Sequence, residues 1–276
     1  MLKDTKANKI FLLVLLVAFV LFRGTGALRT SINGKETKTI PFRQGGDLSI
    51  KTDNDAISIM KDDAATAVAV TYKGAGKATY KTDGDDISIT VSESLHLGKN
   101  GTLYITIPSS VTPGDLKITS TSGAIDLSEL SVDGDVRLRT VSGKINLADL
   151  SAGKDIRLST TSGAIDASGL TGGNQTEIGS TSGSVSFDAY HGSDLYLHTT
   201  SGSITGSSDM TKGTIHIAST SGGVDFDLVQ AVPDYHIDVK SLSGQINVPQ
   251  TSAGEGNVNV ELETTSGRIA FTPKGQ

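Results

Sequence analysis

A Ser-Gly pair recurs through the second half of this chain at nearly equal intervals, and this repeat constrains the fold more than any other feature. The glycines of the pair are Gly123, Gly143, Gly163, Gly183, Gly202, Gly222, Gly244 and Gly267, at intervals of 20, 20, 20, 19, 20, 22 and 23 residues. Asp135–Leu150 (DVRLRTVSGKINLADL) is a clear copy of the repeated unit. A period of this length is typical of a stacked array of structural repeats.

Four positions of each unit are apolar, seven and five residues before the glycine and two and four residues after it. In the unit of Gly143 they are Val136, Leu138, Ile145 and Leu147. The exceptions among the eight units are Thr176, Ala167 and Gly206. Because polar residues stand between the apolar ones, the pattern predicts two short strands per unit, each with one buried face.

Two arrangements can use such strands. An antiparallel meander would form one very wide sheet whose apolar face nothing in the sequence covers. In a solenoid, each unit is one coil whose two apolar faces meet, and like positions of successive coils stack as ladders. The equal intervals therefore predict an all-β, parallel β-solenoid with coils of about 20 residues. Right-handed winding is expected for parallel strands joined by crossovers.

The Ser-Gly pair itself is expected at a corner of the coil. Glycine suits a corner that needs positive φ or that a neighbouring coil approaches closely. The serine before it would bond the local backbone or the serine of the next coil.

The segment before the regular array carries fainter copies of the unit. Gly45–Ile59 and Lys77–Ile89 both read as degenerate coils, and Thr37–Ser110 is expected to be an irregular first part that caps the solenoid. The domains are thus 1–28 (anchor or signal), 29–36 (linker), 37–110 (irregular part), 111–273 (regular repeats) and 274–276 (tail). Pro273 and Lys274 are expected to discourage a further strand from docking on the last coil.

The N-terminal segment is a separate element. It contains Lys3, Lys6 and Lys9, then the unbroken apolar run Ile10–Phe22, then Arg23. As a helix the run rises about 20 Å, against about 30 Å of hydrocarbon in a bilayer. Two interpretations stay open: an uncleaved single-pass anchor of the cell membrane, or a signal peptide cut near the small residues Thr25 and Ala27. Both make the rest of the chain extracytoplasmic, either tethered or secreted.

Composition excludes several functions. The 276 residues include no Cys, so disulfides, thiolate metal sites, lipoprotein-type anchors and cysteine nucleophiles are absent. A formal net charge of −6 argues against nucleic acid as a partner. No cofactor is predicted.

The sequence also resembles a known family. A strand ending in Ile-Pro, then DLKITSTSGAIDL and the repeated phrases DVRLRTVSGKINL, DIRLSTTSGAIDA and SGRIAF, are similar to the bacterial putative-adhesin domain, a domain of unknown function. With the N-terminal apolar segment, the layout resembles LiaG-like membrane-associated envelope proteins. The resemblance implies a bacterial cell-surface β-solenoid connected with envelope stress, and it carries over no active site.

The outward column six residues before the glycine is the leading candidate site. It begins with Lys117, Arg137 and Arg157, and Arg139 reinforces it. Ladder spacing of about 4.8 Å would suit an anionic cell-wall polymer. The alternative is a solvated strand face whose charges keep the protein soluble.

Three further groups of residues could supply metal ligands, but none is predicted to bind a metal ion. Asp126, Asn146 and Asp166 share an outward column, Asp53–Asp55 and Asp83–Asp86 are short acidic runs at expected corners, and His198 and His216 lie outward on adjacent coils. Calcium takes six to eight oxygen ligands. Hydrated surface and turn geometry account for these residues equally well.

The function expected from these observations is not enzymatic. Loops through most of the array are short, Trp is absent, and the Ser-Gly pairs lack the G-x-S-x-G context of a nucleophile. We therefore expect an adhesin-like or scaffold protein of the cell envelope, whose partners are the membrane and cell-wall polymer or envelope proteins. The alternatives are a binding module for anionic wall polymer and a polysaccharide lyase or hydrolase.

Overall fold

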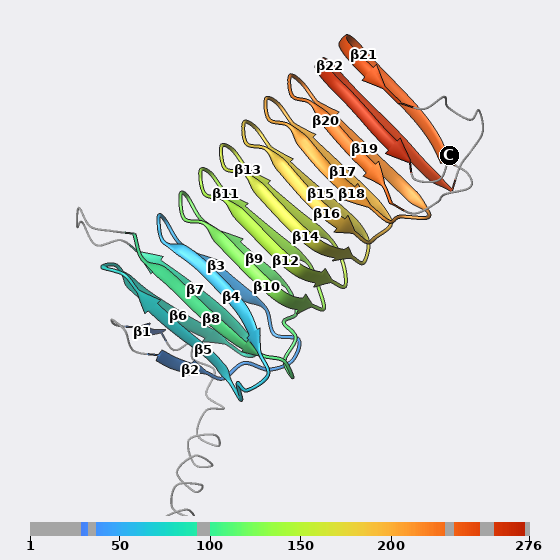
Figure 1. Ribbon diagram of the computed structural model, residues 1–276. Helices are drawn as coiled ribbons and strands as arrows, with labels where there is room; N and C mark the ends of the chain where they lie inside the picture. The colour runs from blue at the N-terminus through green and yellow to red at the C-terminus, as the bar shows by residue number, and fades with distance from the viewer. Residues whose placement is uncertain (1–28, 33–36, 93–99, 230–234, 249–256, 274–276) are drawn as a thin grey trace, which may run out of the picture.

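The computed structural model describes residues 29–32, 37–92, 100–229, 235–248 and 257–273. Within these ranges the chain forms 22 strands and no helix, and the strands join in one continuous hydrogen-bonded sheet. Figure 1 shows the result: an elongated stack of coils that lie side by side from the N-terminal strands to β21. The predicted all-β, largely parallel solenoid is confirmed.

The predicted anchor or signal segment, residues 1–28, lies outside the described residues. The described ranges contain no helix long and apolar enough to cross a membrane.

The regular array consists of twelve strands on two faces. The odd face holds β9 (Leu116–Thr119), β11 (Val136–Thr140), β13 (Ile156–Thr160), β15 (Gln175–Ser180), β17 (Asp194–Thr199) and β19 (Gly213–Ser219). The even face holds β10 (Ile125–Val132), β12 (Ile145–Ala152), β14 (Ile165–Gly172), β16 (Val185–Tyr190), β18 (Ile204–Ser208) and β20 (Val224–Leu228). Neighbouring strands of a face are parallel and in register by one repeat, so Val136 pairs with Ile156 and Ile145 with Ile165.

The core contains the four predicted columns. Val136, Leu138, Ile145 and Leu147 are 0 to 4% exposed. Each buried aliphatic side chain stabilises the fold by roughly 1.5–3 kcal/mol before chain entropy is subtracted. The stacked coils therefore form a dry interior without any helix.

The even face carries a fifth apolar column that the sequence analysis missed. Leu130, Leu150, Leu170 and Tyr190 are at most 1% exposed. They become buried because the residue before each has positive φ: Glu129, Asp149, Gly169 and Ala189 have φ between 53° and 63°. This left-handed residue bends the strand and interrupts its period-two alternation.

The N-terminal part of the stack is only partly as predicted. β3 (Leu48–Lys51) and β4 (Ala56–Asp62) stack in parallel on β9 and β10, so Gly45–Ile59 is a true coil. The prediction for Lys77–Ile89 is wrong: β6 (Lys77–Asp83) and β7 (Asp86–Ser92) form an antiparallel hairpin. The next coil is made instead by β7 on β3 and β8 (Thr102–Pro108) on β4.

Antiparallel strands close this end of the stack. β5 (Val68–Lys73) pairs with β8, and β6 pairs with β7. On the outer side, β2 (Thr37–Ile40) pairs with β5, and β1 (Arg29–Ile32) pairs with β6. Residues 29–32, expected to be linker, are thus part of the cap. Because a strand of alternating residues can pair in either direction, periodicity did not specify the antiparallel cap.

The C-terminal end reverses the order of the chain. β22 (Val258–Pro273) pairs with β19 and β20, and β21 (Tyr235–Asn247) pairs with the outer edge of β22. The expectation that Pro273 keeps further strands from the last coil is therefore wrong, since β21 docks on the coil that contains it. The coil at this end of the stack is β21.

Candidate functional site

The predicted basic residues do lie together on the odd face. The register places Lys117 beside Arg137 and Arg137 beside Arg157, on β9, β11 and β13. Arg139 lies two residues further along β11, beside Thr119 and Ser159. We call these four residues the basic ladder.

Carboxylates offset much of this positive charge. Arg137 lies 2.6 Å from Asp135, and Arg157 lies 2.9 Å from Asp155 and 3.7 Å from Glu177. Among the described residues, Lys117 and Arg139 have no carboxylate within ion-pairing distance. The basic ladder therefore offers fewer free positive charges than its sequence indicates.

The aspartates beneath the ladder have a structural role that sequence analysis missed. The carboxylate of Asp115 accepts the N–H of Asp135 at 2.9 Å, and Asp135 accepts the N–H of Asp155 at 3.1 Å. Burial disfavours the charged form of Asp135, but the Asp155 N–H and the Arg137 guanidinium outweigh it and lower the pKa of this carboxyl. These aspartates connect successive coils, and their equal spacing by 20 residues was the available signal.

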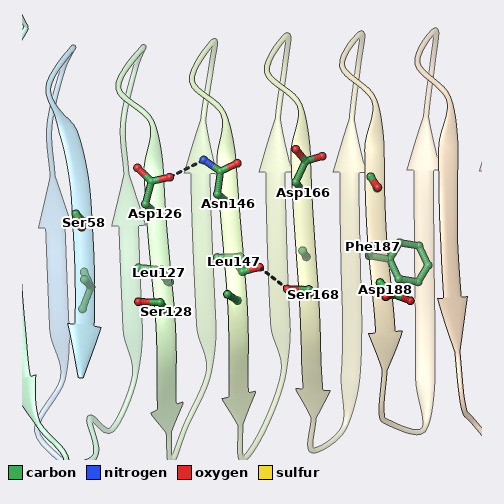
Figure 2. A pocket seen from close by; sticks show the side chains of 14 residues that line it. Ser58, Asp126, Leu127, Ser128, Asn146, Leu147, Asp166, Ser168, Phe187 and Asp188 are labelled. Carbon is green, nitrogen blue, oxygen red and sulfur yellow. Dashed lines mark hydrogen bonds between the residues drawn. The ribbon is translucent and has the colours of Figure 1, made fainter. Parts of the chain in front are cut away.

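The even face carries a groove that crosses β4, β10, β12, β14 and β16. Two polar columns line it, and the open volume is about 380 Å³. One column is Ser58, Asp126, Asn146, Asp166 and Ser186; the other includes Ser128, Ala148, Ser168 and Asp188. Figure 2 shows these side chains on successive strands, with Leu127 and Leu147 between the two columns. We call this hollow the even-face groove.

The even-face groove lies beside the bend of each strand, since the second column immediately precedes the left-handed residues. Its five strands span about 19 Å at the usual strand spacing of about 4.8 Å. The same types of hydrogen-bonding group thus recur at each step along the axis of the stack. Such a surface suits an extended ligand that has its own repeat.

Hydrogen bonds and ion pairs hold the carboxylates of the groove. Asn146 donates its side-chain N–H to Asp126, Lys144 forms an ion pair with Asp166, and Ser207 donates its hydroxyl to Asp188 (Figure 2 shows the first of these bonds). Three aspartates against one lysine leave the groove net negative. Hydroxyl groups of Ser58, Ser128 and Ser186 complete its lining.

The remaining acidic and histidine candidates are structural or separated. Asp55 is 4% exposed, and its carboxylate accepts the N–H of Gly101 and the hydroxyl of Tyr72. Asp83–Asp86 forms the turn between β6 and β7. His216 lies 2.9 Å from Glu261 and pairs in register with Tyr196, not with His198. In the part of the chain that the structure describes, no group of three metal-ligating side chains comes together.

The fold and these surfaces define a class of protein: a β-solenoid with short corners whose outward columns repeat at every coil. Comparison with known families then places the chain. It belongs to the Toastrack DUF4097 family, a domain of unknown function whose model matches residues 46–272. The resemblance to the putative-adhesin domain family of unknown function is thereby confirmed. No protein of curated function matches the chain.

Solved structures of similar proteins include three bacterial ones. A "putative cell adhesion protein" from Clostridium sporogenes ATCC 15579 is 12% identical, covers 90% of this chain and 100% of its own, and has a TM-score of 0.25. A "putative adhesin" from Bacteroides fragilis NCTC 9343 is 12% identical, with coverage of 90% and 98% and a TM-score of 0.49. A "putative adhesin" from Parabacteroides distasonis ATCC 8503 is 10% identical, with coverage of 89% and 98% and a TM-score of 0.31.

Proposed function

We propose that this protein is a non-enzymatic, adhesin-like scaffold of the bacterial cell envelope, whose even-face groove binds an uncharged, hydroxyl-rich polymer such as a polysaccharide. The observation that carries the proposal is the recurrence of hydroxyl, amide and carboxylate groups along five coils. We also propose right-handed winding and an extracytoplasmic location, with residues 1–28 as the membrane tether. The basic flank and apolar run of that segment support its role in export.

The charges of the groove favour an uncharged polymer over an acidic one. Asp126, Asp166 and Asp188 would repel an anionic chain, whereas sugar hydroxyls can donate to carboxylates and accept from serine hydroxyls. The regular spacing lets one geometry of contact repeat, so that individually weak hydrogen bonds add up along the polymer.

Binding without turnover fits the environment of the same carboxylates. Asp126, Asp166 and Asp188 each have a side-chain partner in the structure, which holds them as positioned acceptors. Hydrolysis of a glycosidic bond needs one carboxyl poised as an acid and another as base or nucleophile. We therefore propose that the groove retains a polymer intact.

Polymer binding by the groove can be tested by measuring how strongly the protein is retained on an immobilised polysaccharide. Ala148→Tyr should fill it, because Ala148 lies in the second column, midway along the groove. We expect full-length protein to be retained on an uncharged polysaccharide, and Ala148→Tyr to weaken retention by roughly tenfold, the loss of about 1.4 kcal/mol. Ser159→Tyr, at an outward position of the odd face outside the basic ladder, is the matched control. Equal retention of both variants would contradict the assignment.

Cell fractionation tests the tether. Full-length protein should sediment with membranes and be cut by protease added to cells stripped of their wall. Deletion of residues 1–28 should leave the protein in the soluble fraction. Recovery of the full-length protein from the cytosol would refute the proposed location.

The basic ladder supports a second candidate, a site for an anionic wall polymer, because the register aligns Lys117, Arg137 and Arg157. The double variant Lys117→Glu and Arg139→Glu should abolish salt-sensitive retention on an acidic polymer. Unchanged retention of this variant would eliminate the candidate, and it would leave the test of the even-face groove unaffected.

A further inference from the structure

The two ends of the stack differ in how well they close the core. At the N-terminal end, Ile32 of β1 and Ile40 of β2 are both 0% exposed. At the other end, Ile246 of β21 is 46% exposed, whereas Ile269, its register partner on β22, is 0% exposed. The core is thus sealed at the N-terminal end, whereas at the end coil β21 it is closed at Ile237, which is 2% exposed, and open at Ile246.

The side chains of β21 follow the repeat as if another coil lay beyond it. Ile237, Val239, Ile246 and Val248 occupy the four apolar columns of the solenoid. Val239 is only partly buried and Leu242 is 85% exposed. Among the described residues, β21 pairs with β22 alone, so the other edge of this 13-residue strand has no strand partner there. Such an edge readily takes up another strand.

We propose that the open edge of β21 pairs with the same edge of a second copy of this protein, end to end and about a two-fold axis. The two-fold operation makes the facing strands antiparallel. Each copy then places its own end coil where the next coil of the other copy's stack would lie. This inference concerns the end of the stack and does not rest on the proposed polymer groove.

Charge complementarity fixes the register. With the axis at Val239, each Val239 faces its counterpart, and Asp238 of each copy lies opposite Lys240 of the other. These side chains are outward and exposed. Within one chain Lys240 Nζ lies 2.7 Å from Glu261, 3.2 Å from Glu263 and 3.4 Å from Asp238, so Asp238 of the second copy would join carboxylates that already surround this ammonium group. Opposite charges directly across an antiparallel pair stabilise it, and like charges destabilise it. A strand with an acid and a base two residues apart is self-complementary in this register.

The same register covers the most exposed apolar residue of the end coil. Leu242 of one copy lies opposite His236 of the other, whose ring is half-buried. On the second arm of β21, Ile246 comes against the matching arm of the other copy. The contact therefore removes from water the apolar side chains that distinguish this end from the interior coils.

Disulfide trapping tests the contact, because the natural chain contains no Cys. Directly opposite residues of antiparallel strands have Cα atoms about 4.5–5.5 Å apart, within the range that a disulfide spans. Full-length Val239→Cys should form a disulfide-linked dimer under mild oxidation. Arg139→Cys, an outward residue in the middle of the stack, is the control for random collision and for shared detergent micelles.

The register has its own test. Asp238→Cys and Lys240→Cys should each crosslink poorly alone and efficiently when mixed, because each faces the other across the axis. Efficient crosslinking of Lys240→Cys alone would overturn the register. Wild-type protein should also sediment as a dimer, and Ile246→Asp as a monomer that keeps the far-ultraviolet circular dichroism of a folded β-protein.

The outcome that overturns the proposal is a monomeric wild-type protein whose Val239→Cys variant crosslinks no more than Arg139→Cys. That result would mean that two copies do not meet at the edge of β21.

Discussion

Each repeat glycine is required by the coil stacked against it. A Cβ on Gly222 would lie 1.6 Å from the carbonyl oxygen of Gly202, and one on Gly163 would lie 1.8 Å from that of Gly143. Neither glycine has positive φ. Of the two reasons for glycine that the sequence left open, close approach of the neighbouring coil is therefore the one that applies here.

Alanine substitution at two adjacent glycines distinguishes the steric clash between coils from the loss of backbone flexibility that any glycine substitution causes. Gly222→Ala forces the coils apart and should cost about 1–3 kcal/mol of unfolding free energy. Gly223→Ala should be close to neutral, because its Cβ would meet nothing nearer than 3.8 Å. Urea unfolding of both variants measures the difference. Equal midpoints would contradict the packing argument.

At six of the eight corners, the hydroxyl that accepts the glycine N–H stands three residues before the glycine, not one. At Gly244 and Gly267 the corresponding hydroxyls, of Ser241 and Thr264, have no hydrogen-bond partner among the described residues. Thr160 Oγ1 accepts the N–H of Gly163 at 2.9 Å, and Ser180 Oγ accepts that of Gly183 at 2.8 Å. The serine next to the glycine is exposed, and in the corner of Gly163 it is the backbone N–H of Ser162 that bonds the preceding coil.

The expected side-chain bond of the adjacent serine to backbone is present at two corners, where the hydroxyls of Ser243 and Ser266 donate to the carbonyls of Thr265 and Thr220 at 3.3 and 3.5 Å. At the other corners the hydroxyl three residues before the glycine takes this role, because spacing alone does not show which hydroxyl faces inward.

Removing this hydroxyl leaves a buried N–H without its acceptor. Thr160→Val keeps the shape of the side chain and should lower the unfolding free energy by about 1–3 kcal/mol. Thr160→Ser retains the acceptor and should cost much less. Thermal or urea unfolding compares the two variants, and a Ser variant as unstable as the Val variant would argue against the hydrogen bond.

At the scale of the strand, the bend on the even face adds a fifth core column. The left-handed residue, Glu129 in β10 and Asp149 in β12, lets the next residue turn inward. The sequence did not reveal this column because a bend breaks the period-two alternation on which the prediction depended. A pattern of apolar positions does not show which polar residue adopts the left-handed conformation, so the bend could not be predicted from it.

The fifth column should contribute as much as the four predicted ones. Leu150 is 1% exposed, so Leu150→Ala should cost about 2–5 kcal/mol. The outward variant Arg139→Ala should change the unfolding free energy by no more than about 0.5 kcal/mol. Chemical denaturation tests both. A small effect at Leu150 would mean that the strand does not bend as described.

Tyr190 continues this column and makes the stability of the stack sensitive to alkali. Burial, and then the nearby charge of Asp194, raise the pKa of Tyr190 to about 12. In the unfolded chain a tyrosine loses its proton near pH 10, so between these values the unfolded state binds fewer protons and stability falls as pH rises. The loss should be on the order of 2 kcal/mol.

Unfolding by urea at increasing pH measures this loss, with Tyr190→Phe as the comparison. The Phe variant loses the hydrogen bond from the Tyr190 hydroxyl to the Asp194 carbonyl. It should therefore be less stable at neutral pH but lose less stability above pH 10. Parallel pH profiles for the two proteins would assign the alkaline transition to other groups.

At the scale of the whole molecule, the sequence specified the coils but not their order. Every coil presents the same apolar faces, so the pattern does not say which coil is whose neighbour. The pattern therefore did not predict two features of the strand order. The coil of β3 and β4 lies between the coil of β7 and β8 and the regular array. At the other end, β22 lies between β21 and the regular array. The sequence did not predict the groove for a related reason, since the groove depends on a bend and on columns from five separate strands.

Hydrogen exchange should report the reversed order at the C-terminal end. β22 is hydrogen-bonded on both edges and β21 on one, so β22 amides should exchange more slowly, although β21 precedes it in the chain. The measurement belongs in the Ile246→Asp variant, which keeps the end coil unpaired. Faster exchange in β22 than in β21 would contradict the order of strands.

The end coil lies at the opposite extreme of the stack from β1, the first strand after the apolar segment (Figure 1). Two molecules joined tip to tip therefore hold their N-terminal strands two solenoid lengths apart and facing in opposite directions. With residues 1–28 as the proposed membrane tether, two copies in the same membrane could not easily form the proposed contact, whereas copies on two opposing cells could. The polarity of the stack would then place the contact between cells and not within one membrane.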